Sequence, residues 1–409
     1  MPYYRRNLYI LSTTIFLAAI SWNQIMPFLP LFLKSMGIKG ADLKWWIGMV
    51  FSVQAVASII AQPFWGKLGD SYGRKPMIIR AGLFLTCIYY GMSFCQTPWQ
   101  LALFRFLNGA LTGFIPGSIT LIATNTPQEK TPSFVATSQV AASAGLIVGP
   151  AIGSWLADSV GYRGSMRVSG TAVLISTLFV WLFVKEPNKV NNVEKTSLLQ
   201  DFAISLRSPV LAAVLFTAMV ATVFGSAISP FLALHLLEIA GSHFKHVGLI
   251  FSLPAIAFVL TARFWTRFGE RLGYHYAIII GLAGGGVGAI LLALPHNIWV
   301  FAGLYFIVGI ILASIGPATS ALICTKIEES FRGRAYGMQN AAATLGAFAA
   351  PLAASYFAAQ FGISSVFIFV GVAFLIGSPI FWYMTSRWNT KTSSETSAES
   401  GSTTADTHQ

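Results

Sequence analysis

The chain has 409 residues, of which 55% are hydrophobic and only 10% are charged, whereas about 25% of the residues in a soluble domain are charged. So few charges cannot cover the surface of a water-soluble fold of this length, so we interpret the chain as an integral membrane protein. The long apolar runs lack the alternating pattern of an outer-membrane barrel and predict a bundle of helices. The net charge of +12 comes from scattered loop residues, so we expect no nucleic-acid partner.

The apolar runs predict twelve transmembrane helices in two sets of six. The first set is 8–33, 45–65, 77–95, 98–123, 134–157 and 168–184, and the second set is 209–236, 247–265, 277–294, 298–325, 335–359 and 365–385. We therefore expect an N-terminal six-helix bundle at 1–184, a cytoplasmic linker at 185–208, a C-terminal six-helix bundle at 209–387 and a disordered cytoplasmic tail at 388–409.

The positive charges of the predicted loops set the orientation. The side that holds both termini carries 19 Lys and Arg, with Arg80 counted in the loop after the second span, and the opposite side carries six. Cytoplasmic loops are enriched in these residues, so we expect both termini on the cytoplasmic side of the membrane. Arg105 is the remaining cation and lies inside a predicted span.

The two halves resemble each other at a shift of 200 residues. Between positions 48 and 109, 15 residues are identical to those 200 positions later, among them Gly48 and Gly248, whereas unrelated apolar sequence gives roughly four at about 7% identity. Six spans separate matching positions, so the repeats run parallel and are related by an axis along the membrane normal. A central site is then expected between the halves, lined by polar residues inside the spans: Asn23, Gln24, Gln139, Gln339 and Asn340.

A short glycine-rich and basic loop connects the second and third predicted spans. Its glycines permit a tight turn and its cations hold it at the anionic leaflet. The residues at issue are Gly66, Gly69, Asp70, Gly73, Arg74 and Lys75. Their spacing resembles the signature loop of the major facilitator superfamily, which implies an all-α integral membrane protein with the twelve-helix major facilitator fold.

Three further stretches resemble the drug:proton antiporter branch of that family, and most closely its MdtG-type multidrug efflux members. They are the Pro27–Phe32 stretch, the span that contains Arg105, and the glycine motif Gly145, Gly149, Pro150 and Gly153. Ser154 and Ala136 depart from the family pattern, because glycine is common at both places. Ordinary close packing of helices, rather than a role as a gate, is a nearly equal interpretation of these glycines.

The resemblance implies a secondary transporter, not an enzyme, that exports amphipathic small molecules by proton antiport and alternating access. The alternatives are an exporter of a specific metabolite, sugar or siderophore, or a facilitator without proton coupling. The resemblance also implies that Asp70 acts as a latch. Its side chain would dock near Arg334 and Ala335, at the start of span eleven, in only one of the two states. We expect a monomer whose partners are its substrate, protons and the bilayer, without cofactor or metal.

Arg105 is the sharpest candidate, because a charge at the centre of a span costs about 2.5–3.5 kcal/mol. It acts in proton coupling or substrate binding, or it is a structural residue satisfied by carbonyls and Asn108. All 14 acids lie in loops, at span ends or in the tail, so no mid-membrane carboxylate is present to carry a coupling proton. His235 and Glu238 form a titratable pair near the outer end of span seven, where solvation is the ordinary expectation.

Overall fold

The structure is a computed structural model that describes residues 2–187, 208–241 and 244–403. All of its regular elements in these ranges are helices. The helices of the first half are α1 (Tyr3–Asn23), α2 (Leu29–Ser35), α3 (Gly40–Tyr72), α4 (Arg74–Phe94), α5 (Pro98–Leu111), α6 (Phe114–Thr124) and α7 (Thr131–Phe183). Those of the second half are α9 (Pro209–Ala240), α10 (Phe244–Leu272), α11 (Tyr274–Leu291), α12 (Ile298–Leu312), α13 (Ile315–Lys326), α14 (Glu329–Phe361) and α15 (Ser364–Thr403).

The predicted number of membrane crossings follows from these helices. Ten segments of the described chain are long and apolar enough to span a membrane. One of them, α7, contains two crossings, because Gly161 interrupts it with a non-helical φ of 73° and ψ of 169°. The 21-residue α1, which α2 extends, is not among these ten segments and corresponds to the first of the twelve predicted spans. The predicted all-helical membrane fold is therefore confirmed.

Two of the predicted spans are interrupted where the sequence analysis expects continuous helices. The fourth span divides into α5 and α6 at Thr112 and Gly113, and Gly113 has a φ of +136°. The tenth span divides into α12 and α13 at Ala313 and Ser314. The first of these breaks is possible because glycine tolerates a positive φ that other residues rarely adopt.

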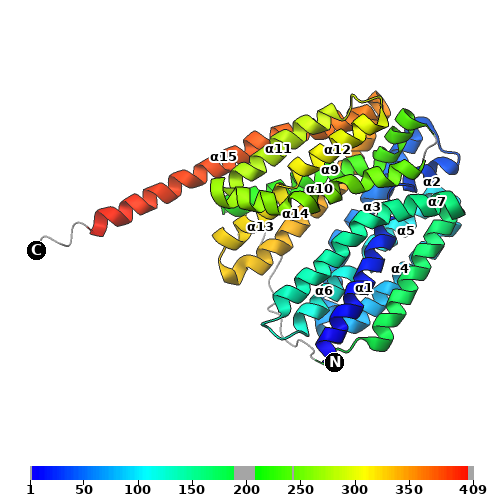
Figure 1. The fold of residues 1–409 in the computed structure, drawn as a ribbon, viewed down its shortest axis with the longest axis horizontal. Coiled ribbons are helices and arrows are strands. Elements are labelled where there is room, and N and C mark those ends of the chain that lie inside the picture. The colour runs from blue at the N-terminus through cyan, green and yellow to red at the C-terminus, as the bar shows by residue number, and fades with distance from the viewer. Residues whose placement is uncertain (1, 188–207, 242–243, 404–409) are drawn as a thin grey trace, which may run out of the picture.

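The C-terminal tail also differs from the expectation. The sequence analysis predicts disorder from residue 388, whereas α15 continues to Thr403, well beyond the second half (Figure 1). The segment 387–400 contains neither Pro nor Gly, so nothing in it stops a helix that has already formed. Of the predicted linker, residues 188–207 lie outside the described part of the chain, as do 404–409 of the tail.

The two halves lie side by side as separate bundles (Figure 1). They pack together through α3 against α14 and α7 against α10. Lys44 Nζ donates a hydrogen bond of 2.7 Å to the carbonyl of Ala358, and Ser252 Oγ donates one to the carbonyl of Ile147. The second of these bonds lies further along α10 and in the middle of the first part of α7, whereas the first lies near the start of α3 and the end of α14. We call this end of the molecule the joined end, and the opposite end, which carries the N-terminus and the loop between α3 and α4, the loop end.

Candidate functional site

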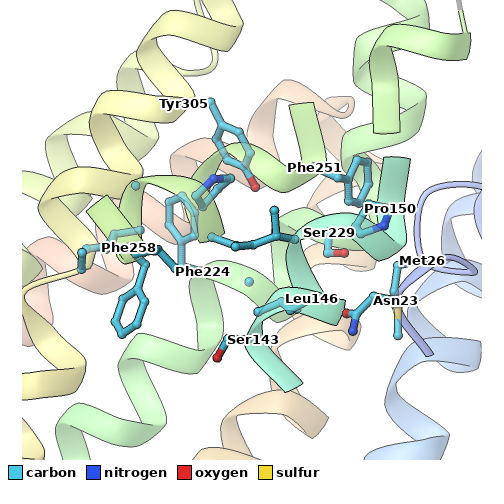
Figure 2. A pocket seen from close by; sticks show the side chains of 18 residues that line it. Asn23, Met26, Ser143, Leu146, Pro150, Phe224, Ser229, Phe251, Phe258 and Tyr305 are labelled. Atoms are coloured by element: carbon cyan, nitrogen blue, oxygen red, sulfur yellow. The ribbon is translucent and has the colours of Figure 1, made fainter. Parts of the chain in front are cut away.

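A central cavity lies between the two halves. It consists of two adjoining spaces of ≈ 510 and ≈ 730 Å³ that share lining residues, among them Asn23, Ser143 and Ser229. Figure 2 shows Asn23 and Met26 approaching from the first half, opposite Phe224 and Tyr305 of the second. Both halves therefore build the site, as the parallel repeat predicts.

The walls of the central cavity differ in chemistry. The first half supplies most of its polar side chains, including Gln54, Ser58, Gln62 and Thr112 next to the break between α5 and α6. The second half supplies an aromatic wall, which consists of Phe224, Phe251, Phe258 and Tyr305, and the first half adds Trp22, Phe51 and Phe114. In Figure 2 the hydroxyl group of Tyr305 points toward the middle of the cavity. A molecule with one polar and one apolar end matches this arrangement.

Arg105 is the one charged residue among the described residues that line the central cavity. Its side chain is 4% exposed and comes from α5. The Nε atom donates a hydrogen bond of 3.3 Å to the carbonyl of Val50, and the guanidinium carbon lies 5.3 Å from the ring centroid of Phe51. These contacts are with a neutral carbonyl and a ring face. Neither contact involves a carboxylate, so neither cancels the positive charge of Arg105.

Several buried polar atoms around α3, α4 and α5 have no hydrogen-bond partner among the described residues. They are Gln54 Oε1, Tyr89 OH and both amide atoms of Asn108. Arg105 therefore bonds to Val50 rather than to Asn108, the neighbour that the sequence analysis named. Buried polar groups without partners are costly, and Gln54 lines the cavity, so this wall has hydrogen-bonding capacity left for a ligand.

The structure distributes the five predicted lining residues among four environments. Asn23 lines the central cavity. Gln339 and Asn340 line an adjoining space of ≈ 380 Å³ beside α9, where Gln339 Nε2 donates to Thr319 Oγ1 at 3.4 Å. Gln139 is exposed and is not among the residues that line these spaces.

Gln24 requires a correction. It lies 2% exposed in the packing between α1 and the second part of α7, where its Nε2 donates to Ser169 Oγ and to the carbonyl of Ser165. The side chain is therefore used in binding two elements of the first half together and does not line the cavity. Its neighbour Asn23 occupies the adjacent, cavity-facing position of the helix, because successive helical residues point about 100° apart.

The loop between α3 and α4 is held by an acid that the sequence analysis did not single out. Glu186 accepts hydrogen bonds from the backbone N–H groups of Arg74 and Lys75, at 2.6 and 2.8 Å. A carboxylate at a helix N-terminus satisfies free N–H groups and complements the helix dipole. Gly73, with a φ of +99°, makes the turn that starts α4, and a Cβ there would lie 3.0 Å from Glu186.

The remaining predicted residues of this loop, Gly66, Gly69 and Asp70, make few contacts that the structure describes. The backbone of Gly69 accepts the N–H of Gly73 at 3.1 Å, and a Cβ on Gly66 would meet nothing within 4 Å. The side chain of Asp70, the predicted latch, lies outside what the structure describes, although its backbone is part of α3. Arg334, near its expected partner site, is exposed, and its guanidinium lies 4.5 Å from the ring centroid of Phe331.

The glycine motif of α7 presents two faces. Gly145, Gly149 and Gly153 pack against α1, where a Cβ on Gly145 would lie 2.5 Å from that of Ala19. Pro150 and Ser154 instead face α10 of the other half, where a Cβ on Gly248 would lie 2.5 Å from the carbonyl oxygen of Pro150 and still closer to Ser154.

The same arrangement recurs in the second repeat. Gly48 of α3 packs against Pro351 and Ser355 of α14, at a Cβ distance of 2.8 Å from the carbonyl oxygen of Pro351. Gly346 packs against Met219 of α9, as Gly145 packs against α1. Ser154, which departs from the family pattern, thus takes part in one of two equivalent contacts between the halves.

His235 and Arg80 lie in other surroundings than the sequence analysis expects. His235 is 4% exposed, not solvated, with ring centroids of Phe301 and Phe367 at 5.5 and 4.7 Å and no hydrogen-bond partner for either nitrogen among the described residues. Glu238 is exposed, so the two do not form a pair. Arg80, counted as a loop residue above, lies inside α4.

Comparison with known proteins gives one family for the whole chain. The family model described as Major Facilitator Superfamily matches residues 11–241 and 214–407. The chain is 33% identical over 371 residues to the multidrug resistance protein MdtG of Proteus mirabilis (strain HI4320), which covers 90% of this chain and 92% of that protein. It is 30% identical to the protein of the same name from Serratia proteamaculans (strain 568), over 97% of this chain and 98% of that one.

Solved structures resemble the fold. A bacterial homologue of the human lysosomal transporter Spinster, in an inward-facing and unoccupied conformation, matches with a TM-score of 0.78 at 13% identity, over 94% of this chain and 98% of that one. The nucleoside transporter NupG matches with a TM-score of 0.74 at 15% identity, over 93% of this chain and 99% of that one. At such identities the likeness concerns the fold alone.

Proposed function

Because this chain belongs to the major facilitator superfamily and is thus a multi-pass secondary transporter of small molecules, we propose that it exports amphipathic compounds by proton antiport. The proposal places the chain in the bacterial inner membrane as a monomer, with both termini and the loop end in the cytoplasm. The observation that carries it is the central cavity, which takes most of its polar side chains from the first half and aromatic side chains from both halves. Relatives at 30–33% identity that are named multidrug resistance proteins support it.

The distribution of charge narrows the substrate class. The described lining of the cavity contains Arg105 and no Asp or Glu. An uncompensated cation repels strongly cationic compounds, because electrostatic energies are large where water is scarce. We therefore expect neutral or anionic amphipaths, with the polar group toward Arg105 and Gln54 and the apolar group against the aromatic wall.

The place where the halves meet supports transport by alternating access. In the structure the hydrogen bond of Lys44 to Ala358 joins the halves at the joined end, and Gln62, Gln139 and Asn340 toward the loop end are exposed. With the loop end in the cytoplasm, this is the inward-facing state of the proposed cycle. In the outward-facing state the joined end separates and Asp70 docks at the start of α14.

Flux measurements test the proposal. The chain is reconstituted in proteoliposomes with an imposed pH gradient, and uptake of a panel of neutral, anionic and cationic fluorescent amphipaths is followed. We expect transport of neutral and anionic compounds that is driven by the gradient and abolished by a protonophore. Flux that ignores the gradient would establish the facilitator instead, and flux of a single metabolite, sugar or siderophore would establish the specialised exporter.

A further inference from the structure

A second groove lies on the outer surface of the first half, away from the central cavity. Its volume is ≈ 680 Å³, and it runs along α4 beside the end of α7. Leu83, Phe84 and Trp181 line it and are 46%, 40% and 58% exposed. Such large exposed apolar side chains, on a segment that spans the membrane, face lipid rather than water.

Two cations line the same groove near the start of α4. Lys75 Nζ donates a hydrogen bond of 2.8 Å to the carbonyl of Trp181, which is a neutral acceptor. Arg80 stacks on Trp65, with its guanidinium carbon 3.3 Å from the ring centroid, and its Nη2 donates to the carbonyl of Leu111 at 3.3 Å. The two residues are five positions apart, about 8 Å along the helix axis.

The charge of this pair is not cancelled by an acid in the groove. No Asp or Glu is among the described residues that line it, and the nearby Glu186 is used on the backbone N–H groups that begin α4. Two guanidinium nitrogens of Arg80, Nε and Nη1, are buried without a hydrogen-bond partner among the described residues. Unsatisfied charged donors at membrane depth are costly, so a polar group from the surroundings is expected to approach them.

We propose that this groove binds an anionic glycerophospholipid of the leaflet that faces the loop end. The lipid phosphate lies between Lys75 and Arg80, with a small movement of the Arg80 side chain, and an acyl chain lies along Leu83 and Phe84. Clustered Lys and Arg beside a membrane helix attract anionic headgroups, and here the apolar wall continues into the hydrocarbon region directly from the cation pair. The site depends on the membrane location and not on the transported substrate.

The second repeat provides an internal comparison. The positions 200 residues after Lys75 and Arg80 are His275 and Ile280 in α11. His275 lies against Tyr276, with ring centroids 4.1 Å apart, and Ile280 is apolar, so neither position carries the Lys or Arg found in the first repeat. The lipid site is therefore expected on the first half only.

The experiment uses the native cysteines of the full-length chain as reporters. Cys87 lines the groove and is exposed, whereas Cys324 is exposed in the second half, far along the chain. The protein is placed in nanodiscs of phosphatidylcholine, with or without phosphatidylglycerol, and the rate at which a lipophilic maleimide labels each cysteine is measured by mass spectrometry. We expect phosphatidylglycerol to slow the labelling of Cys87 several-fold, because both cations contribute to binding of the anionic headgroup. The labelling rate of Cys324 should stay unchanged.

Variants separate this site from general surface charge. Lys75→Gln with Arg80→Gln is expected to abolish the protection of Cys87. Arg263→Gln with Arg267→Gln removes the same charge from exposed positions of α10 and is expected to leave it intact. Equal labelling of Cys87 in both lipid mixtures, or equal loss of protection in the two double variants, would overturn the proposal. Protection by inorganic phosphate in phosphatidylcholine discs would also overturn it, and the wild-type comparison stands even if a variant fails to fold.

Discussion

At the residue scale, the central cavity depends on one charge. Arg105 lies in it with a neutral carbonyl and a ring face as partners, and the polar atoms nearby, such as Gln54 Oε1, keep capacity for a ligand. The sequence pointed to Arg105 because a cation inside an apolar run is costly and therefore informative. It could not place Gln24 or His235, because an isolated polar side chain on a helix has no local signal for the face it occupies.

Arg105 is the residue whose substitution is most informative. Arg105→Lys keeps the charge but loses the planar fork of donors, so transport is expected to fall about tenfold, which corresponds to 1.4 kcal/mol. Arg105→Ala is expected to abolish it. Uptake into proteoliposomes is measured at equal protein amounts, with Arg163→Lys, which keeps a cation near the carbonyls of Ser93 and Cys95, as control. Full transport by Arg105→Ala would refute a functional role.

At the element scale, helix ends and small residues decide how the spans pack. The breaks at Gly161 and Gly113 and the caps at Thr97 and Asn297 occupy short polar or glycine positions. The sequence predicted the existence of the spans well, since 20 apolar residues in a row have few alternatives. It could not predict that Glu186 caps α4, because that contact joins residues more than 100 positions apart.

The cap on α4 gives a stability prediction. Glu186→Gln removes the negative charge and leaves one acceptor oxygen for two N–H groups, so the first half is expected to lose about 1 kcal/mol. The melting temperature of the purified protein in detergent should fall. Glu238→Gln, at an exposed position in α9, serves as control and should leave it unchanged. Identical melting of wild type and Glu186→Gln would show that the cap does not stabilise the protein.

The paired glycines at the joined end give a conformational prediction. Gly248→Leu places a side chain against Pro150 and Ser154, where even a Cβ has no room. The two halves should then separate at the joined end. This increases the distance between spin labels at the exposed positions 39 and 360, which is measured by pulsed electron paramagnetic resonance. Gly303→Leu, at a position where a Cβ would meet nothing within 4 Å, is the control. An unchanged distance in Gly248→Leu would contradict the role of this contact.

At the scale of the whole molecule, the parallel repeat accounts for the two-bundle architecture and for paired contacts. Gly48 against Pro351 and Gly248 against Pro150 are equivalent interfaces, and the identity of the two glycines was visible in the sequence. The sequence does not show which end of the molecule is joined. The inward-facing and outward-facing states consist of the same residues and differ by the movement of one bundle on the other. The side of the membrane on which the termini lie, and the coupling of transport to protons, stay predictions.

The latch tests the two-state description as a whole. If Asp70 docks at the start of α14 when the loop end closes, labels at the exposed positions 72 and 337 should come closer together in the outward-facing state. Asp70→Asn removes the charge that a helix N-terminus or an arginine holds, so this short-distance population should disappear and uptake should fall about tenfold. Asp42→Asn, which changes an exposed acid in the first turn of α3 at the joined end, is the matched control and should keep both. Transport and distances like those of the wild type in Asp70→Asn, at normal expression, would exclude the latch, since a contact needed to hold one state cannot be removed without shifting the population of the two.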